Sequence, residues 1–138
     1  MAKREFDVIV WGATGFTGEL VSQYLAKTYG VGGELRWAIA GRNREKLEAV
    51  RENCLPKAKQ KSLPLIIADS EDHQSLATMV ARTRVVCSTV GPYARYGTPL
   101  VAACTAEGVD YCDLTGEVQW MAAVIPAYQS AASASGAR

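Results

Sequence analysis

Three glycines at regular spacing follow the first apolar segment of the chain. Gly12, Gly15 and Gly18 stand after Phe6–Trp11 and open a segment with helical periodicity. A buried strand that turns through glycines into a helix presents free backbone N–H groups and the positive end of the helix dipole at one point. Such a point binds phosphate, so the segment predicts the pyrophosphate site of a dinucleotide-binding fold.

Each position in this turn has an expected role. Gly12 permits the turn, Gly15 lets the backbone approach a ligand, and Gly18 lets the helix pack closely on the strand. Thr14 stands where the commonest form of the motif has its middle glycine, and a hydroxyl of Thr14 or Thr17 is expected to contact phosphate. The alternative interpretation is a plain strand–turn–helix junction of an α/β domain.

The residues after the second apolar segment indicate which dinucleotide binds. Leu35–Ala40 predicts the second strand, and Gly41 and Arg42 follow it, roughly 20 residues beyond the glycine turn. Sites for NAD place an acid here, but this chain has none between Leu35 and Arg44. The Arg42 guanidinium suits the 2′-phosphate of NADP because it offers a planar fork of donors. The alternative is that Arg42 and Arg44 are solvated charges at the start of a helix.

Composition and charge limit the classes of function. The 138 residues, 49% of them hydrophobic, suit one domain with a packed core. A net charge of +1 gives no general attraction to nucleic acid or anionic membranes. No apolar run approaches the ~20 residues of a membrane span and no signal-peptide pattern is seen, so a cytoplasmic location is expected.

The cysteines lack the spacing of a metal site. None of the four belongs to a C-x-x-C pair, and the chain has a single histidine, so no metal ligand is expected. Their apolar flanks favour buried free thiols in a reducing cytosol. These residues are Cys54, Cys87, Cys104 and Cys112.

Apolar runs and amphipathic segments alternate along the chain. The remaining predicted strands are Leu63–Ala68, Val85–Val90 and Val109–Asp113. The first predicted helix covers Phe16–Tyr29, and its inward residues are Leu20, Val21, Tyr24 and Leu25. The second places Leu47, Val50 and Cys54 inward and ends at Pro56. The third places Leu76, Met79 and Val80 inward. A fourth starts near Thr98 and Pro99 with Leu100, Val101 and Cys104 inward, and the last starts near Glu117 with Met121, Val124, Ile125 and Tyr128 inward. Pro126 is expected to kink or split that last helix.

Repeated β-α-β units determine the expected fold. They predict right-handed crossovers and a doubly wound parallel sheet of Rossmann type, with helices on both faces. The expected strand order is 3-2-1-4-5, and a ligand is expected beyond the carboxyl ends of the first and fourth strands. Residues that directly follow strands are therefore the candidates for ligand contact.

Three further segments follow strands at this edge. Asp69 is expected either to accept a hydrogen bond from the adenine amino group or to cap the next helix, with Ser70 as the cap if Asp69 is occupied. Thr89–Tyr93 is expected to cover the nicotinamide half, with Gly91 allowing close approach. Glu117 is explained most simply as a carboxylate paired with a helix dipole.

Four ordered motifs carry a resemblance that covers nearly the whole chain: V-x-W-G-A-T-G-F-T-G, A-G-R-N-R-E-K-L, T-V-G-P-Y-A-R-Y-G-T-P-L-V-A-A-C and Y-C-D-L-T-G-E. The chain resembles the saccharopine dehydrogenase-like oxidoreductases, and more narrowly the N-terminal NADP-binding domain of the branch that includes trans-acting enoyl reductases. The resemblance implies a pyrophosphate site at Gly12, Thr14, Gly15, Phe16, Thr17 and Gly18, a 2′-phosphate contact at Arg42 beside Gly41, an adenine contact at Asp69, and nicotinamide contacts at Val90, Gly91 and Tyr93.

The resemblance also implies a reaction. Members of the wider family reduce or oxidise the C–N bond of saccharopine, and others act on a carbon–carbon double bond of lipid precursors. We therefore expect hydride transfer between NADP(H) and an imine, enoyl or carbonyl carbon of a small-molecule or lipid-precursor substrate. Tyr93 and Tyr96 are candidates for the general acid, and Arg95 for a contact with an anionic substrate. Packing of their loop against a further domain explains all three better, so no catalytic residue is assigned.

The resemblance implies that the chain is one domain of a larger protein. Residues 1–138 would be its N-terminal NAD(P)-binding domain, a sixth strand and a second domain would follow, and homo-oligomers are possible partners. Acting alone, the chain is expected to bind cofactor without turnover. A second hypothesis is a non-catalytic NADP(H)-responsive module, and a third is a folding unit whose site needs the missing part.

Overall fold

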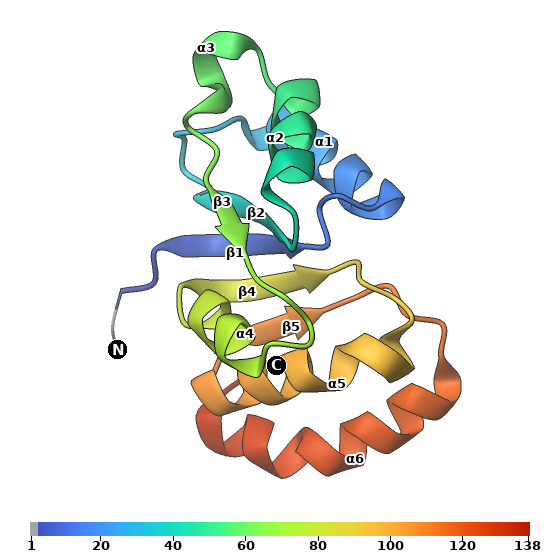
Figure 1. Ribbon diagram of the computed structural model, residues 1–138. Coiled ribbons are helices and arrows are strands. Elements are labelled where there is room, and N and C mark those ends of the chain that lie inside the picture. The colour runs from blue at the N-terminus through green and yellow to red at the C-terminus, as the bar shows by residue number, and fades with distance from the viewer. Residues whose placement is uncertain (1–2) are drawn as a thin grey trace.

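The computed structural model describes residues 3–138, which form a five-stranded parallel sheet between two layers of helices (Figure 1). The strands are β1 (Phe6–Trp11), β2 (Trp37–Gly41), β3 (Leu65–Ile67), β4 (Thr83–Ser88) and β5 (Asp110–Cys112). The helices are α1 (Phe16–Tyr29), α2 (Arg44–Cys54), α3 (Lys57–Gln60), α4 (His73–Val80), α5 (Tyr93–Glu107) and α6 (Val118–Ser135).

The strand order is β3-β2-β1-β4-β5, which confirms the predicted doubly wound sheet. β1 lies at the centre and pairs in parallel with β2 and β4, with Val10 beside Ile39 on one side and Cys87 on the other. Figure 1 shows α1 and α2 on one face of the sheet and α4, α5 and α6 on the other. Because every pair is parallel, all strands deliver their carboxyl ends to the same edge.

Burial on both faces explains the continuous apolar runs of the central strands. Ile9 and Val10 are adjacent in β1, are fully buried, and face opposite cores. The Ile9 side packs against α4 and α5 through residues such as Leu76 and Leu100. The Val10 side packs against α1 and α2 through residues that include Leu47.

The inward face of α1 differs from the predicted one. Val21 and Leu25 do pack on the core, but Leu20 and Tyr24 are 48% and 60% exposed. Gly18 and Ser22 are the buried positions of the helix. Small residues occupy this face because α1 approaches the end of β1 closely, which large side chains would prevent.

Two prolines lie inside helices, and neither ends one. α5 begins at Tyr93 rather than near Thr98, so Pro99 is in its interior, and α6 is one helix through Pro126. Each proline removes one i→i−4 hydrogen bond. The carbonyls released, those of residues 95 and 122, belong to exposed residues, where water can satisfy them.

Smaller differences concern element ends. β4 lies two residues earlier than predicted because Phe6 of β1 pairs with Thr83. The short helix α3 was not expected. Among residues 3–138, no helix is long and apolar enough to cross a membrane.

Candidate dinucleotide site

The turn after β1 has no room for a side chain at its first glycine. Gly12 adopts a φ of +83°, and a Cβ there would lie 2.5 Å from Cγ2 of Val90 and 2.9 Å from Oγ1 of Thr89. The Thr89 hydroxyl lies 3.0 Å and 3.1 Å from the carbonyl oxygens of Trp11 and Gly12, to which it can donate. The turn after β1 and the loop after β4 are thus packed directly on each other.

The other two glycines of the motif differ in their surroundings. A Cβ on Gly18 would collide with the carbonyl oxygen of Gly12 and lie 2.7 Å from Cα of Ala13, so this glycine permits close packing. Gly15 is exposed, and a Cβ there would meet only the Gly12 oxygen, at 3.5 Å. Gly15 is also the N-cap residue of α1, whose first N–H groups have no side-chain cap. These open donors fit a phosphate group.

The end of β2 lies beside this turn. A Cβ on the buried Gly41 would be 3.6 Å from Cγ2 of Thr14, so the two segments are in contact. Arg42 follows and is exposed, and within the described residues its guanidinium forms no ion pair. The α2 N-terminus is capped by Asn43, whose Oδ1 accepts from the Lys46 N–H at 3.0 Å. Arg42 is therefore a free cation next to the turn.

The residues after β3 do not divide their roles as predicted. Asp72 caps α4, accepting hydrogen bonds from the N–H groups of Gln74 and Ser75, so neither Asp69 nor Ser70 is the cap. Asp69 is half-buried, and its Oδ1 accepts from the Glu71 N–H at 2.9 Å. The Asp69 carboxylate therefore stabilises its own turn, and its contact with adenine stays a prediction.

The two ends of the loop after β4 differ in their exposure to solvent. Gly91 is exposed, whereas Tyr93 is 5% exposed and packs on Trp120 with ring centroids 5.5 Å apart. The Tyr93 hydroxyl donates to the Ser88 carbonyl at 3.3 Å, and burial raises the pKa of this phenol. Tyr93 therefore supports the loop from the interior and does not offer its hydroxyl to solvent as a proton donor.

Glu117 has a structural role that the sequence analysis missed. Its carboxylate accepts hydrogen bonds from the N–H groups of Tyr93 at 2.6 Å and Ala94 at 3.1 Å, and so caps α5 rather than its own helix. The contact joins the loop after β5 to the loop after β4. An acid directly after a strand, at the edge shared with another helix N-terminus, is the signal that could have indicated this cap.

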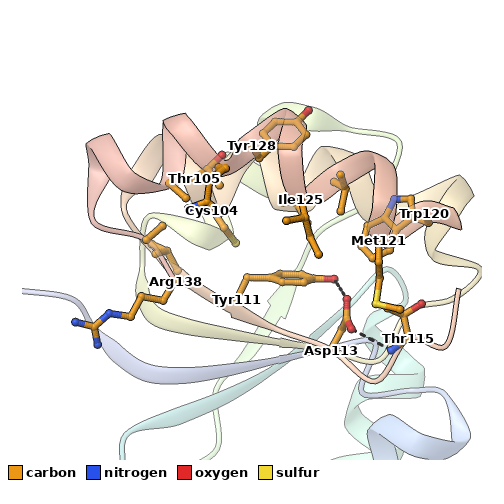
Figure 2. Close-up of a pocket in the computed structure, with 16 residues that line it drawn as sticks. Cys104, Thr105, Tyr111, Asp113, Thr115, Trp120, Met121, Ile125, Tyr128 and Arg138 are labelled. Atoms are coloured by element: carbon orange, nitrogen blue, oxygen red, sulfur yellow. Dashed lines mark hydrogen bonds between the residues drawn. The ribbon is translucent and has the colours of Figure 1, made fainter. Parts of the chain in front are cut away.

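A separate cavity of about 290 Å³ lies between α5, α6 and β5 (Figure 2). Its walls are mainly apolar side chains such as Met121 and Ile125. In it the Tyr111 hydroxyl donates to Asp113 at 2.6 Å, and Asp113 also accepts from the Thr115 N–H at 3.0 Å. Burial and the Asp113 carboxylate raise the pKa of Tyr111, so the phenol is neutral at physiological pH. No residue of the glycine turn lines this cavity.

Relatives of the chain are found among proteins and among structures. The profile of the family described as "Saccharopine dehydrogenase NADP binding domain" matches residues 8–137. A trans-acting enoyl reductase of Mycobacterium tuberculosis (strain ATCC 25618 / H37Rv) is 47% identical over 137 residues, or 99% of this chain and 32% of that protein. The chain thus spans about a third of the length of the curated relatives it matches.

Solved structures share the fold at lower identity. The apo saccharopine dehydrogenase (L-Glu forming) of Saccharomyces cerevisiae superposes with a TM-score of 0.63 and 19% identity, over 84% of this chain and 24% of that one. AtPrR2 in complex with NADP+ and (+)pinoresinol superposes with a TM-score of 0.58 and 22% identity, over 99% and 48% of the two chains.

The strand order and the glycine turn between β1 and α1 define a Rossmann-type dinucleotide-binding domain. Within that class, the chain belongs to the saccharopine dehydrogenase NADP-binding domain family. The predicted family and the predicted cofactor, NADP, are confirmed at this level.

Proposed function

We propose that this domain holds NADP(H) across the carboxyl edge of the sheet. The observation that carries the proposal is the uncapped N-terminus of α1, open at Gly15 and adjacent to the unpaired guanidinium of Arg42. A helix N-terminus with free N–H groups binds phosphate, and an unpaired arginine at the end of the neighbouring strand β2 suits a second phosphate. Among residues 3–138, no side chain caps the N-terminus of α1 and no carboxylate pairs with Arg42.

The remaining contacts follow the order of the strands. The pyrophosphate would lie on Gly12, Thr14, Gly15, Phe16, Thr17 and Gly18, the 2′-phosphate on Arg42 beside Gly41, the adenine by Asp69, and the nicotinamide by Val90, Gly91 and Tyr93. Gly91 would provide the close approach because it is exposed. Tyr93 would act through the loop that its buried ring supports.

The reaction belongs to a larger protein in this proposal. Bound NADPH supplies a hydride, and the substrate would be an imine, enoyl or carbonyl compound, small or derived from lipid precursors. The relatives named trans-acting enoyl reductases support the enoyl class. Residues 1–138 would be the NAD(P)-binding domain of such an oxidoreductase, in the cytoplasm and in a possible homo-oligomer. The free state of all four cysteines supports that compartment.

Calorimetric titration of the chain with NADPH and NADH tests the proposed site. NADPH should bind ~10-fold or more tightly than NADH, and Arg42→Ala should remove a difference of ~1.4 kcal/mol or more. Arg84→Ala, an exposed arginine at the opposite edge of the sheet, serves as the control and should leave both affinities unchanged. Equal affinities in the unsubstituted chain would refute the role of Arg42, and absence of binding of either nucleotide would refute the site.

A further inference from the structure

β4 and β5 bring two cysteines side by side at the carboxyl edge of the sheet. Cys87 and Cys112 are direct partners in the parallel register. Side chains at paired positions of neighbouring strands point to the same face, and such strands lie about 4.7–4.9 Å apart. This separation falls within the roughly 4.4–6.8 Å that a disulfide allows between two Cα atoms.

The two thiols differ in access. Cys112 is exposed and Cys87 is half-buried, and both are free. The Cys112 Sγ lies 3.8 Å from the carbonyl oxygen of Val86, so it leans toward the strand that carries Cys87. Cys112 is therefore the more accessible residue of the pair, and Cys87 lies beside it on the neighbouring strand.

The pKa values of the two thiols also differ, and the more exposed cysteine has the lower one. The neighbouring Cys87 thiol lowers the pKa of Cys112 to about 7, against the opposing effects of burial and of Asp113. The same interaction, with burial, raises the pKa of Cys87. The other two cysteines are different, because burial raises the pKa of Cys54 and raises that of Cys104 to about 12.

We propose that Cys87 and Cys112 form a reversible thiol oxidation site, in which exposed Cys112 reacts with a hydroperoxide and neighbouring Cys87 resolves the product to a disulfide. An accessible thiol poised next to a resolving cysteine is the arrangement that oxidation-sensitive sites share. The proposal rests on the register, access and environment of the pair, and it does not depend on the NADP site.

Oxidation of the two thiols to a disulfide takes two steps. The Cys112 thiolate attacks one oxygen of the peroxide, the O–O bond breaks, and a Cys112 sulfenic acid and hydroxide result. The Cys87 thiol then attacks the sulfenic sulfur, an S–S bond forms, and water leaves with the sulfenic oxygen. In total the two thiols lose two electrons and two protons, and the hydroperoxide is reduced. A dithiol reductant reverses the change by exchange.

The test exposes the reduced chain to hydrogen peroxide and maps the products by mass spectrometry. The unsubstituted chain should yield a peptide pair joined through Cys87 and Cys112, and dithiothreitol should restore both thiols. Cys87→Ala should instead accumulate a Cys112 sulfenic acid that dimedone traps. Cys112→Ser should give neither product, and Cys54→Ser serves as the control that oxidises like the unsubstituted chain.

Three results would overturn the proposal. They are equal dimedone labelling of Cys112 with and without Cys87, preferential oxidation of Cys54 or Cys104, and a disulfide that joins different molecules only. Thermal unfolding and circular dichroism of each variant establish that the comparison is made between folded chains. Alanine at the half-buried Cys87 and serine at the exposed Cys112 remove little volume, so the variants are expected to fold.

Discussion

At the scale of single residues, Gly18 shows how little space separates α1 from the turn before it. A Cβ at this position collides with the Gly12 carbonyl, and the neighbours are backbone atoms that cannot move aside. We therefore expect Gly18→Ala to lower the free energy of unfolding by about 1–3 kcal/mol, as overpacked sites do. Urea denaturation measures the change. Gly116→Ala is the matched control, because nothing lies within 4 Å of a Cβ there, and an equal loss in both variants would contradict the steric argument.

Also at this scale, the thiol of Cys112 should react at unusually low pH. Only the thiolate is a nucleophile, so alkylation accelerates as pH rises through the pKa. With that pKa at about 7, the rate with iodoacetamide should reach half its maximum near neutrality. Cys87→Ala should move the midpoint upward toward the ~8.5 of an ordinary cysteine. A midpoint that is the same in both chains would show that Cys87 does not stabilise the thiolate.

Roles of individual residues were predictable where local geometry requires them. The roles of Gly12 and Gly18 were predicted from their spacing together with the apolar run before them and the helical segment after them, because a strand–turn–helix junction needs residues without side chains there. The burial of Tyr93 was not predictable, because it depends on Trp120, a residue 27 positions later in the chain that packs against it in space. The proposed ligand contacts remain predictions.

At the scale of elements, the start of α5 depends on an acid from another loop. Glu117 supplies the acceptors for the first two N–H groups of the helix. Replacing this cap should cost about 1 kcal/mol in the free energy of unfolding, within the usual range for N-caps. We expect Glu117→Ala to show that loss and to speed hydrogen exchange at the amides of Tyr93 and Ala94.

Glu107→Ala is the control for this experiment. Glu107 lies at the other end of the same helix, half-exposed, with its carboxylate 3.9 Å from Arg4. Exposed ion pairs contribute little to stability. Glu107→Ala should therefore lower the free energy of unfolding by less than about half of the loss in Glu117→Ala. Unchanged exchange at Tyr93 in Glu117→Ala would show that the cap is not needed.

The same contact explains why helix ends were the weakest part of the sequence prediction. Periodicity located the apolar faces of α2 and α4 correctly, because core contacts repeat every three or four residues. It placed the start of α5 about five residues late, because Pro99 suggested a first turn and the true cap comes from 24 residues further along. No local pattern contains that information.

At the scale of the whole molecule, a charged cluster fixes the edge of the sheet opposite to the site. The Asp7 carboxylate accepts from both the backbone N–H and the guanidinium of Arg36, at 2.7–3.2 Å, and Arg84 lies 3.8 Å away. These hydrogen bonds, chiefly from the Arg36 side chain, hold the pKa of Asp7 below its usual value. The cluster ties the start of β1 to the residue before β2.

The lowered pKa of Asp7 means that its carboxylate stabilises the folded domain at neutral pH and loses this effect in acid. A carboxyl whose pKa is lowered by folding stabilises the folded state above its unfolded pKa of about 3.9, and the contribution disappears as pH falls through the lower folded value. Asp7→Asn should therefore be less stable than the unsubstituted chain at pH 7, and the difference should shrink below about pH 4. Urea unfolding at several pH values measures this, with the exposed Glu34→Gln as control. A difference that stays constant with pH would contradict the assignment.

The topology as a whole was predictable because it follows from alternation. Short apolar runs separated by amphipathic helices admit few arrangements other than a parallel sheet covered on both faces. Strand order and layers were therefore correct although several ends were not. The alternation of strands and helices does not predict which side chains pair across neighbouring strands, such as Cys87 with Cys112. That pairing depends on the register of the strands.

The contact between the turn after β1 and the loop after β4 has a consequence for folding. The Thr89 hydroxyl and the Gly12 carbonyl are 77 residues apart in sequence, and they meet only when β1 and β4 are paired. The glycine turn therefore reaches its final shape only when β1 and β4 are paired, so the unfolded chain lacks this shape. A nucleotide that binds this shape alone must raise the unfolding midpoint in proportion to the logarithm of its concentration above Kd. Heat resistance would then vary with the supply of cofactor.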